Sequence, residues 1–301
     1  MQNKQTLRPS PTAILNPRID STFKAIFTQE TEGSYIALQS FLSSILRRKI
    51  KQVNLTSNEP PVDMPIQMQM SFDVSVIFEN GEKASIEMQG RNQDYNYETR
   101  SEIQVARLLN NNAKKGTNWK SEKVYQISVL NFHLPKHDKQ EMTWYNMRDE
   151  QGYILSGHLN VIYIDLLEMK KLIGRPVDQL SVLQKWGLYL SYADDESKSE
   201  YIKQITNSEK GIMEADLIIG KMSEDDANWF RQNSYDIAHR DYNDGLYNSE
   251  QRGIKKGRNE KALEDAENLL KEGDSPEKVA RCINLPLEKV LELQKEILIK
   301  A

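Results

Sequence analysis

Cysteine is almost missing from this chain of 301 residues, because Cys282 is the only one present. A single thiol excludes an intramolecular disulfide framework and a zinc site built from several cysteines. No apolar run approaches the ~20 residues that a helix needs to span a bilayer. Residues 1–11 are polar and lack the apolar stretch of a signal peptide. These absences predict a soluble, cytoplasmic protein without a membrane partner.

The usual signatures of cofactor and metal sites are missing as well. Neither a Walker loop nor a GxGxxG fingerprint occurs, so we expect no nucleotide cofactor. His133 and His137 are four residues apart, but Pro135 between them argues against a helical metal-binding pair, and we interpret all four histidines as incidental. The formal net charge of -4 argues against a uniformly basic nucleic-acid binder, although it leaves room for a local basic cleft.

Apolar residues make up 38% of the chain, which is enough for a packed core. Some segments repeat their apolar residues every three or four positions, as helices do, and others alternate or run continuously, as strands do. These patterns predict helices over residues 33–49 and 98–115, and strands over residues 69–79, 83–89, 124–134 and 160–167. This order of elements predicts an α/β fold with a mixed sheet flanked by helices.

The second half of the chain is charged and predominantly helical in pattern, which suggests a division into four parts. We expect a flexible arm over residues 1–16, an α/β core over residues 17–192, and a helical extension and linker over residues 193–260. Residues 261–301 predict a small helical module similar to a helix-turn-helix. The balanced charges of its last helix fit a dimerising or packing module at least as well as a DNA reader. Within this module we expect Cys282 to be a small buried side chain.

The predicted hairpin carries the residues that suggest chemistry. Asp73 lies in its first strand, and Glu87 and Gln89 share one face of its second strand, because strand side chains alternate. Two carboxylates on neighbouring strands would bind a hard divalent cation, which favours oxygen ligands and activates water. The alternative is that Asp73 and Glu87 are ordinary polar residues on a solvent-facing side of the sheet.

The register of the hairpin decides whether the two carboxylates meet. A two-residue loop at Asn80-Gly81 would place Val74 opposite Glu87 and turn Asp73 to the other face. A three-residue loop, or a bulge near Asp73, would bring Asp73 opposite Glu87. A shared site therefore predicts one of these two irregularities.

Several short segments, taken in order, resemble one known family. They are the DSTFK run from Asp20 to Lys24, Asp73, the IEMQ run of residues 86–89, Tyr97 with Arg100-Ser101, and Trp186. Together they are similar to the Rpn family of recombination-promoting nucleases and transposases, within the PD-(D/E)XK superfamily. The resemblance covers about residues 16–192 and implies a restriction-endonuclease-like core followed by an all-helical C-terminal region.

The resemblance also implies a function. It suggests a DNA endonuclease, linked to recombination or mobile elements, that uses Mg²⁺ or Mn²⁺ held by Asp73 and Glu87. Gln89 occupies the position where the superfamily usually has a catalytic Lys, so Lys24 would supply the missing positive charge and Asp20 a further carboxylate. The departure at Gln89 keeps an alternative open: a nuclease fold with weak or absent catalysis that binds DNA or a protein partner.

Basic residues follow the hairpin and predict a surface for the DNA backbone. Arg100, Gln104 and Arg107 are spaced to share one helical face, and Lys114 and Lys115 follow them. Arginine and lysine side chains are suited to contact phosphates. The alternative is a solvated helix face of mixed charge. As partners we therefore expect DNA and, through the helical C-terminal region, a second copy of the chain.

Overall fold

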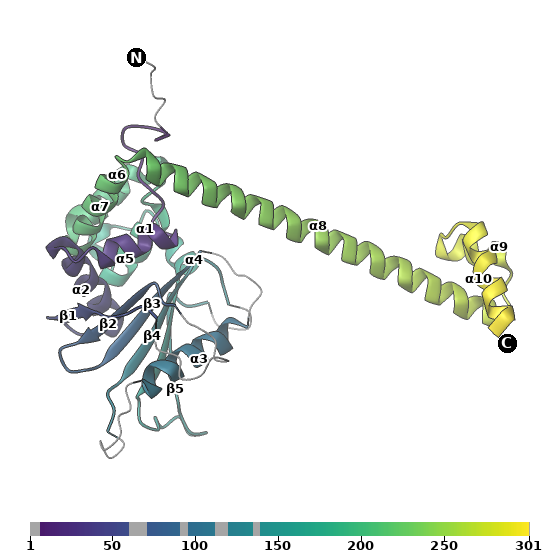
Figure 1. The fold of residues 1–301 in the computed structure, drawn as a ribbon, viewed down its shortest axis with the longest axis horizontal. Coiled ribbons are helices and arrows are strands. Elements are labelled where there is room, and N and C mark those ends of the chain that lie inside the picture. Colours follow the sequence, from purple (N-terminus) through teal and green to yellow (C-terminus); the bar gives the residue numbers. More distant parts are fainter. Residues whose placement is uncertain (1–6, 60–70, 91–95, 112–119, 135–138, 301) are drawn as a thin grey trace. The chain divides into compact units, whose positions relative to one another are not determined.

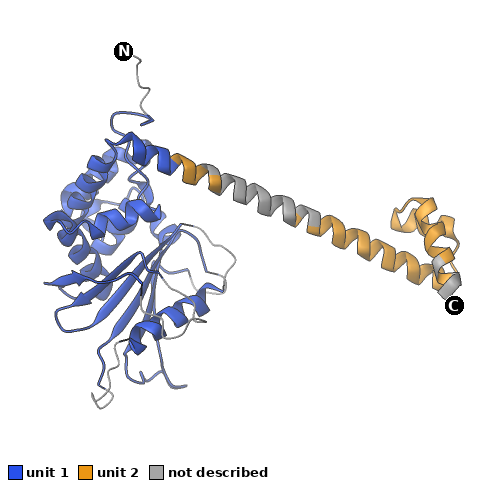
Figure 2. Ribbon diagram, viewed as in Figure 1, with its two compact units in different colours: residues 1–232 blue, residues 233–301 orange. Residues whose placement is uncertain are grey.

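The computed structural model describes residues 7–59, 71–90, 96–111, 120–134 and 139–300 (Figure 1). The chain divides into two compact units, residues 1–232 and residues 233–301 (Figure 2). The first unit thus extends beyond the predicted core boundary at residue 192. Among the described residues, no helix combines the length and the apolar character needed to cross a membrane.

The first unit is built on one six-stranded sheet with the strand order β1-β2-β3-β4-β6-β5. The strands are β1 (Val53–Leu55), β2 (Val74–Phe78), β3 (Lys83–Gln89), β4 (Val124–Leu130), β5 (Met142–Asn146) and β6 (Leu159–Asp165). β1, β2 and β3 pair in antiparallel fashion, β3, β4 and β6 are parallel, and β5 returns antiparallel to β6. The predicted mixed sheet is confirmed, and its three parallel strands end at one common edge.

Helices cover both faces of this sheet (Figure 1). The helices of the first unit are α1 (Asp20–Thr28), α2 (Glu32–Leu46), α3 (Tyr97–Asn110), α4 (Leu166–Lys170), α5 (Val182–Tyr192), α6 (Ser199–Ser208) and α7 (Lys210–Met222). Helices α1, α2 and α5 form the main core with one face of the sheet, whereas α3 packs on the opposite face. The side chains of β3 therefore alternate between the main core and the side that α3 covers.

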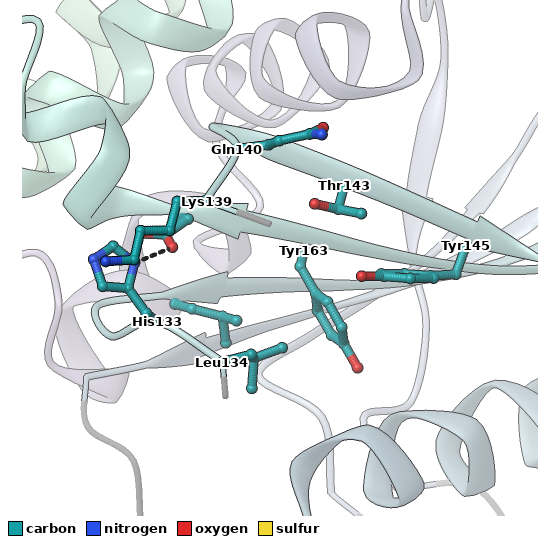
Figure 3. Close-up of a pocket in the computed structure, with 9 residues that line it drawn as sticks. His133, Leu134, Lys139, Gln140, Thr143, Tyr145 and Tyr163 are labelled. Atoms are coloured by element: carbon teal, nitrogen blue, oxygen red, sulfur yellow. Dashed lines mark hydrogen bonds and ion pairs between the residues drawn. The ribbon is translucent and has the colours of Figure 1, made fainter. Parts of the chain in front are cut away.

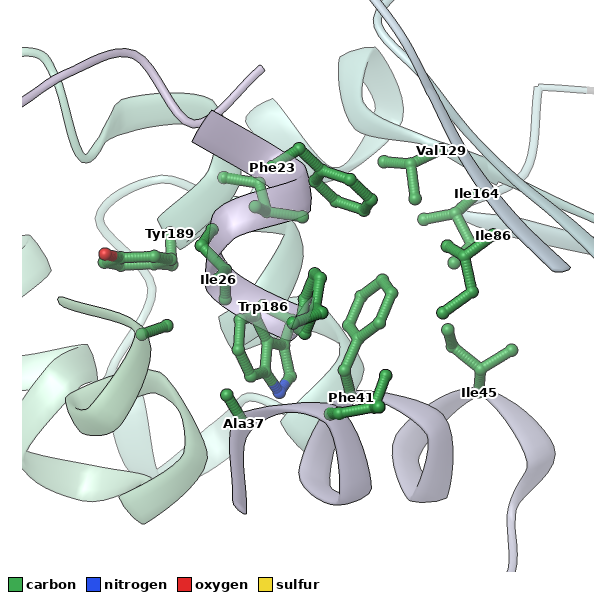
Figure 4. Close-up of a cluster of buried hydrophobic side chains, with 14 of the residues drawn as sticks. Phe23, Ile26, Ala37, Phe41, Ile45, Ile86, Val129, Ile164, Trp186 and Tyr189 are labelled. Carbon is green, nitrogen blue, oxygen red and sulfur yellow. The ribbon is translucent and has the colours of Figure 1, made fainter. Parts of the chain in front are cut away.

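Aromatic side chains fill the centre of the main core (Figure 4). Trp186 of α5 lies between Phe27 of α1 and Phe41 of α2, with ring centroids 5.9 and 5.2 Å away. Ile86 of β3 faces this cluster from the sheet and is fully buried. Because Ile86 points into the core, its neighbour Glu87 points to the other face of β3. The packing of the core thus fixes the direction in which Glu87, the predicted metal ligand, points.

Helix α8 (Asp226–Lys271) begins in the first unit and continues into the second. It covers the later part of residues 193–260, the predicted helical extension and linker, and Gly253 and Gly257 lie within the helix. The second unit also contains α9 (Pro276–Ile283) and α10 (Leu287–Lys300), as the helical pattern predicted. Their small core is built on Ala266, Val279 and Val290. Cys282, expected to be buried, is exposed on α9.

A close contact between α4 and α5 gives a first testable prediction. A Cβ atom on Gly187 would lie 1.8 Å from Met169 Sδ and 3.0 Å from its Cγ, and Met169 is fully buried. We therefore expect Gly187→Ala to lower the free energy of unfolding by about 1–3 kcal/mol, because the core is overpacked. Urea denaturation followed by circular dichroism measures this change.

Gly220→Ala in α7 is the matched control, because nothing lies within 4 Å of the added Cβ. Replacing a helical glycine by alanine at an open position should stabilise the protein by up to about 1 kcal/mol. If Gly187→Ala were as stable as the parent protein, the close contact of Gly187 with Met169 between α5 and α4 would be incorrect.

Candidate active site

The hairpin between β2 and β3 has the three-residue loop that a shared site requires. Val74 pairs with Ile86, and Phe78 N donates a hydrogen bond of 2.9 Å to Glu82 O. Gly81, the last loop residue, has a φ of 82°, a left-handed conformation that glycine adopts at little cost. Continued by one residue, this register places Asp73 opposite Glu87. The two carboxylates consequently lie on the face of the sheet that carries α3.

The carboxylates of Asp73 and Glu87 are both buried, and each accepts hydrogen bonds from different groups. Asp73 is 7% exposed, and its Oδ2 accepts a hydrogen bond of 2.8 Å from the backbone N of Met88. Glu87 is 2% exposed, and its Oε2 accepts hydrogen bonds from Arg100 at 2.9 Å and from Gln89 Nε2 at 3.1 Å. Such burial excludes the alternative in which both residues face solvent.

Two helices add charged groups to this pair. Lys24 of α1 places its Nζ 3.2 Å from Asp73 Oδ1, and Asp20 lies one turn earlier on the same helix. Arg100 comes from the first turns of α3, where its guanidinium also lies 5.8 Å from the ring centroid of Tyr97. The structure thus brings together all five residues that the sequence proposed as catalytic, although segments far apart in the chain supply them.

The proximity of the carboxylates changes their ionisation. Burial, and then repulsion from the Asp73 charge, raise the pKa of Glu87 from 4.5 to about 8. Desolvation and the same Asp73 charge raise the pKa of Asp20. Arg100 and Lys24 oppose the shift at Glu87 without cancelling it. The site therefore holds more negative charge than its cations neutralise, and it retains a proton when no further cation is bound.

The donor set fits a hard divalent cation. Glu87 Oε1 is buried and has no hydrogen-bond partner among the described residues. Asp73 and Glu87 offer carboxylate oxygens, which Mg²⁺ and Mn²⁺ accept as ligands. A cation bound here would satisfy Glu87 Oε1 and relieve the repulsion between the two carboxylates. These residues are accordingly the best candidates in the hairpin for holding a metal ion.

The residues predicted to contact DNA do not form one exposed face. Gln104 is only 3% exposed, so the prediction that it lies on the surface beside Arg107 is wrong. It is buried because α3 turns that position towards the sheet, as it does Val105 and Leu108. Arg100 is engaged by Glu87, and Arg107 lies in the last turn of α3. Lys114 and Lys115 lie outside the described residues.

A second cluster of titratable side chains was missed by the sequence analysis. His133, Asp165 and Glu168 each offer a ligand atom, and these atoms lie within 4.8 Å of one another. The sequence alone predicts that His133 is incidental. The signal that points to this cluster is topological: His133 follows β4, and Asp165 ends the neighbouring parallel strand β6. Carboxyl ends of adjacent parallel strands meet at one edge, so residues there become neighbours.

The mixed sheet, with its helices on both faces and its acidic hairpin, defines a restriction-endonuclease-like core. The family model described as PD-(D/E)XK nuclease family transposase matches residues 17–249, and the chain belongs to this family. This match confirms the resemblance and the fold class predicted from the sequence. No curated protein and no solved structure gives a significant match. The family supports a nuclease-type function, and PD-(D/E)XK nucleases usually use divalent metal ions.

Proposed function

We propose that this protein is a metal-dependent DNA endonuclease that hydrolyses phosphodiester bonds, with Asp73 and Glu87 as the metal ligands. The observation that carries this proposal is the buried pair itself, with Glu87 Oε1 lacking a hydrogen-bond partner in the described part of the chain. Mg²⁺ is the proposed metal, with Mn²⁺ as an alternative. We further propose, from the family, that the activity serves recombination or mobile elements.

Each residue near the carboxylate pair would have its own role in the reaction. Asp73 is held by the Met88 backbone and Glu87 by Arg100, so both carboxylates are oriented before a cation binds. When bound, the cation would stabilise charge on the scissile phosphate and lower the pKa of a water molecule. Lys24, at 3.2 Å from Asp73, would add the positive charge that Gln89 cannot supply.

Gln89 has a different role in this proposal. Its Nε2 donates to Glu87 Oε2, so the amide contributes to holding the Glu87 carboxylate in place. The amide oxygen is an acceptor and can orient a water molecule, whereas an amide carries no charge to offset the phosphate. Asp20, on α1 beside Lys24, would act as a second carboxylate near the water. For the DNA backbone we propose Arg107, Lys114 and Lys115 as contacts.

Cleavage of supercoiled plasmid tests the proposed function. The full chain should nick the plasmid with Mg²⁺ or Mn²⁺ and leave it intact with EDTA. Asp73→Asn should abolish nicking, whereas Glu79→Gln should not, because Glu79 is an exposed carboxylate in the loop of the same hairpin. Salt-sensitive DNA binding without cutting in any metal would reject the nuclease and favour the binding module instead.

The pKa of Glu87 predicts how metal affinity depends on pH. A cation needs the ionised carboxylate, and the metal-free protein keeps Glu87 protonated below about pH 8. The affinity for Mg²⁺ or Mn²⁺ should therefore rise about tenfold per pH unit up to pH 8 and level off above it. Calorimetric titrations between pH 6 and pH 9, in buffers of different ionisation enthalpy, measure the affinity and the released proton. A flat profile would contradict the role of Glu87 as a ligand.

A further inference from the structure

The cluster of His133, Asp165 and Glu168 lies at the same sheet edge as the hairpin site, two strands away. The register aligns Gln89 at the end of β3 with Leu130 of β4 and Asp165 of β6. With strands about 4.8 Å apart, the backbones of Gln89 and Asp165 are separated by about 10 Å. The cluster is thus distinct from the Asp73–Glu87 pair, and none of its residues contributes to that pair.

Asp165 fixes the geometry of the cluster through both of its carboxylate oxygens. Oδ1 accepts hydrogen bonds from the backbone N of Leu167 at 2.8 Å and of Glu168 at 3.1 Å, and so caps α4. Oδ2 lies 2.7 Å from His133 Nδ1. A carboxylate at Nδ1 keeps the proton on that nitrogen and turns the lone pair of Nε2 outward, the arrangement found behind metal-binding histidines. The imidazole is therefore oriented in advance.

Glu168 meets the free nitrogen of this imidazole. Its Oε1 lies 3.6 Å from His133 Nε2, is buried, and accepts no hydrogen bond from the described residues, while the residue as a whole is 9% exposed. Two lone-pair atoms that face each other without a donor need a proton or a cation between them. Ligand bonds of about 2.1 Å at a tetrahedral centre would place two ligand atoms about 3.4 Å apart, close to the observed 3.6 Å.

A small cavity beside the cluster leaves room for a further ligand. Its volume is about 20 Å³, and His133, Asp165, Lys139 and Thr143 are among the residues that line it (Figure 3). That volume accommodates about one water molecule, and the lining is polar enough to hold it. A water held there could complete the coordination of an ion bound to His133 Nε2 and Glu168 Oε1, with Asp165 behind the imidazole.

We propose that His133 and Glu168 are the ligands of a second metal site, oriented by Asp165 and suited to an imidazole-favouring cation of the Zn²⁺ class. An imidazole beside a carboxylate suits Zn²⁺, whereas Mg²⁺ favours oxygen ligands alone. Lys171 Nζ donates a hydrogen bond of 2.5 Å to the other oxygen of Glu168, Oε2, so Oε1 is the atom left for a cation. A bound ion would join the ends of β4 and β6 to α4, at the edge that carries the hairpin carboxylates.

Zn²⁺ binding to the full chain tests this proposal independently of nuclease activity. After chelation and dialysis, titration against a chromophoric zinc chelator should show one tight site that survives Asp73→Asn. His133→Ala and the isosteric Glu168→Gln should each weaken it at least ~100-fold, because each removes a direct ligand. His158→Gln is the matched control, since His158 bonds to the Ser121 backbone away from the cluster.

Thermal unfolding provides the second readout. Free Zn²⁺ at about one hundred times its dissociation constant should raise the Tm of the parent protein by roughly 5–10 °C. The same shift is expected for Asp73→Asn and should be absent in Glu168→Gln. The proposal is overturned if the parent chain binds no Zn²⁺, or if both His133→Ala and Glu168→Gln bind it as the parent does. Loss of DNA cleavage alone would leave this result unaffected.

Discussion

Glu87→Gln should lower the rate of metal-dependent DNA cleavage by about 10³-fold while leaving the fold intact. The substitution keeps the shape of a side chain that is 2% exposed, but it removes the charge that would hold the cation. Losses of this order are typical when a group that stabilises transition-state charge is removed. Single-turnover cleavage of a labelled duplex, with Mg²⁺ well above its dissociation constant, measures the loss.

Stability measurements separate this loss of chemistry from a loss of structure. The raised pKa of Glu87 means that the folded chain keeps a proton that the unfolded chain releases between pH 4.5 and about pH 8. The free energy of unfolding of the metal-free protein should therefore fall over this range, by about a few kcal/mol. Glu87→Gln cannot ionise, so its curve should lack this decline. At pH 9 the metal-free variant should be at least as stable as the parent.

The same pair of experiments would expose a wrong assignment. If Glu87→Gln is inactive, and its free energy of unfolding does not fall between pH 4.5 and about pH 8, Glu87 is a group needed for the chemistry. Cleavage at the parent rate would remove Glu87 from the site, whatever the stability. If the variant were inactive and also much less stable at every pH, the loss would be structural, and the metal titrations would have to decide.

The hairpin between β2 and β3 shows which features of the site could be predicted from the sequence. Alternation placed Glu87 and Gln89 on one face, and the Asn80-Gly81 turn located the hairpin. The register stayed open, because two-residue and three-residue loops both accept glycine at that position. The choice depends on Gly81 taking the left-handed conformation as the third loop residue, and on Ile86 facing the main core. Local sequence could predict the alternatives, and tertiary packing selects between them.

Other predictions failed because spacing within a helix does not reveal which side faces the sheet. Arg100, Gln104 and Arg107 share a stripe by spacing, yet the apolar contacts of α3 turn Gln104 inward. The cluster around His133 was hidden for a related reason. Its members come from segments that only the parallel pairing of β4 and β6 brings together. Contacts of this kind depend on the order in which the strands pair, and local sequence patterns do not reveal that order.

The predicted helical extension and linker over residues 193–260 stays a prediction, and α8 passes through its last part. Spaced glycines near residue 255 favour a hinge, because each glycine weakens a helix by about 1 kcal/mol. The neighbouring residues are strong helix formers, including Lys255, Lys256 and Ala262, and α8 continues through them. By contrast, the start of α9 follows from its local sequence. There Ser275 caps the helix by accepting a hydrogen bond from the backbone N of Lys278, and Pro276 takes the first position.

Trp186→Ala should have the largest effect on stability among the substitutions considered, with a loss of about 3–5 kcal/mol in the free energy of unfolding. Trp186 is fully buried, and its indole packs against Phe27 and Phe41. Its Nε1 also donates a hydrogen bond of 3.0 Å to Ser40 Oγ. The substitution would leave a cavity where α1, α2 and α5 meet, and Ser40 Oγ would keep only its hydrogen bond to Glu209 Oε1.

The position of Trp186 matters for the candidate active site because the same core supports α1 and β3, which carry Lys24 and Glu87. Phe27 lies on the helix that carries Lys24, and Ile86 precedes Glu87 in β3. A cavity at Trp186 should therefore loosen the approach of Lys24 to Asp73 even in molecules that remain folded. Urea denaturation of the full chain measures the stability, with Tyr153→Ala as control, since Tyr153 is 75% exposed and should change it by less than about 0.5 kcal/mol. Equal stability of the two variants would contradict the central place of Trp186 in the core.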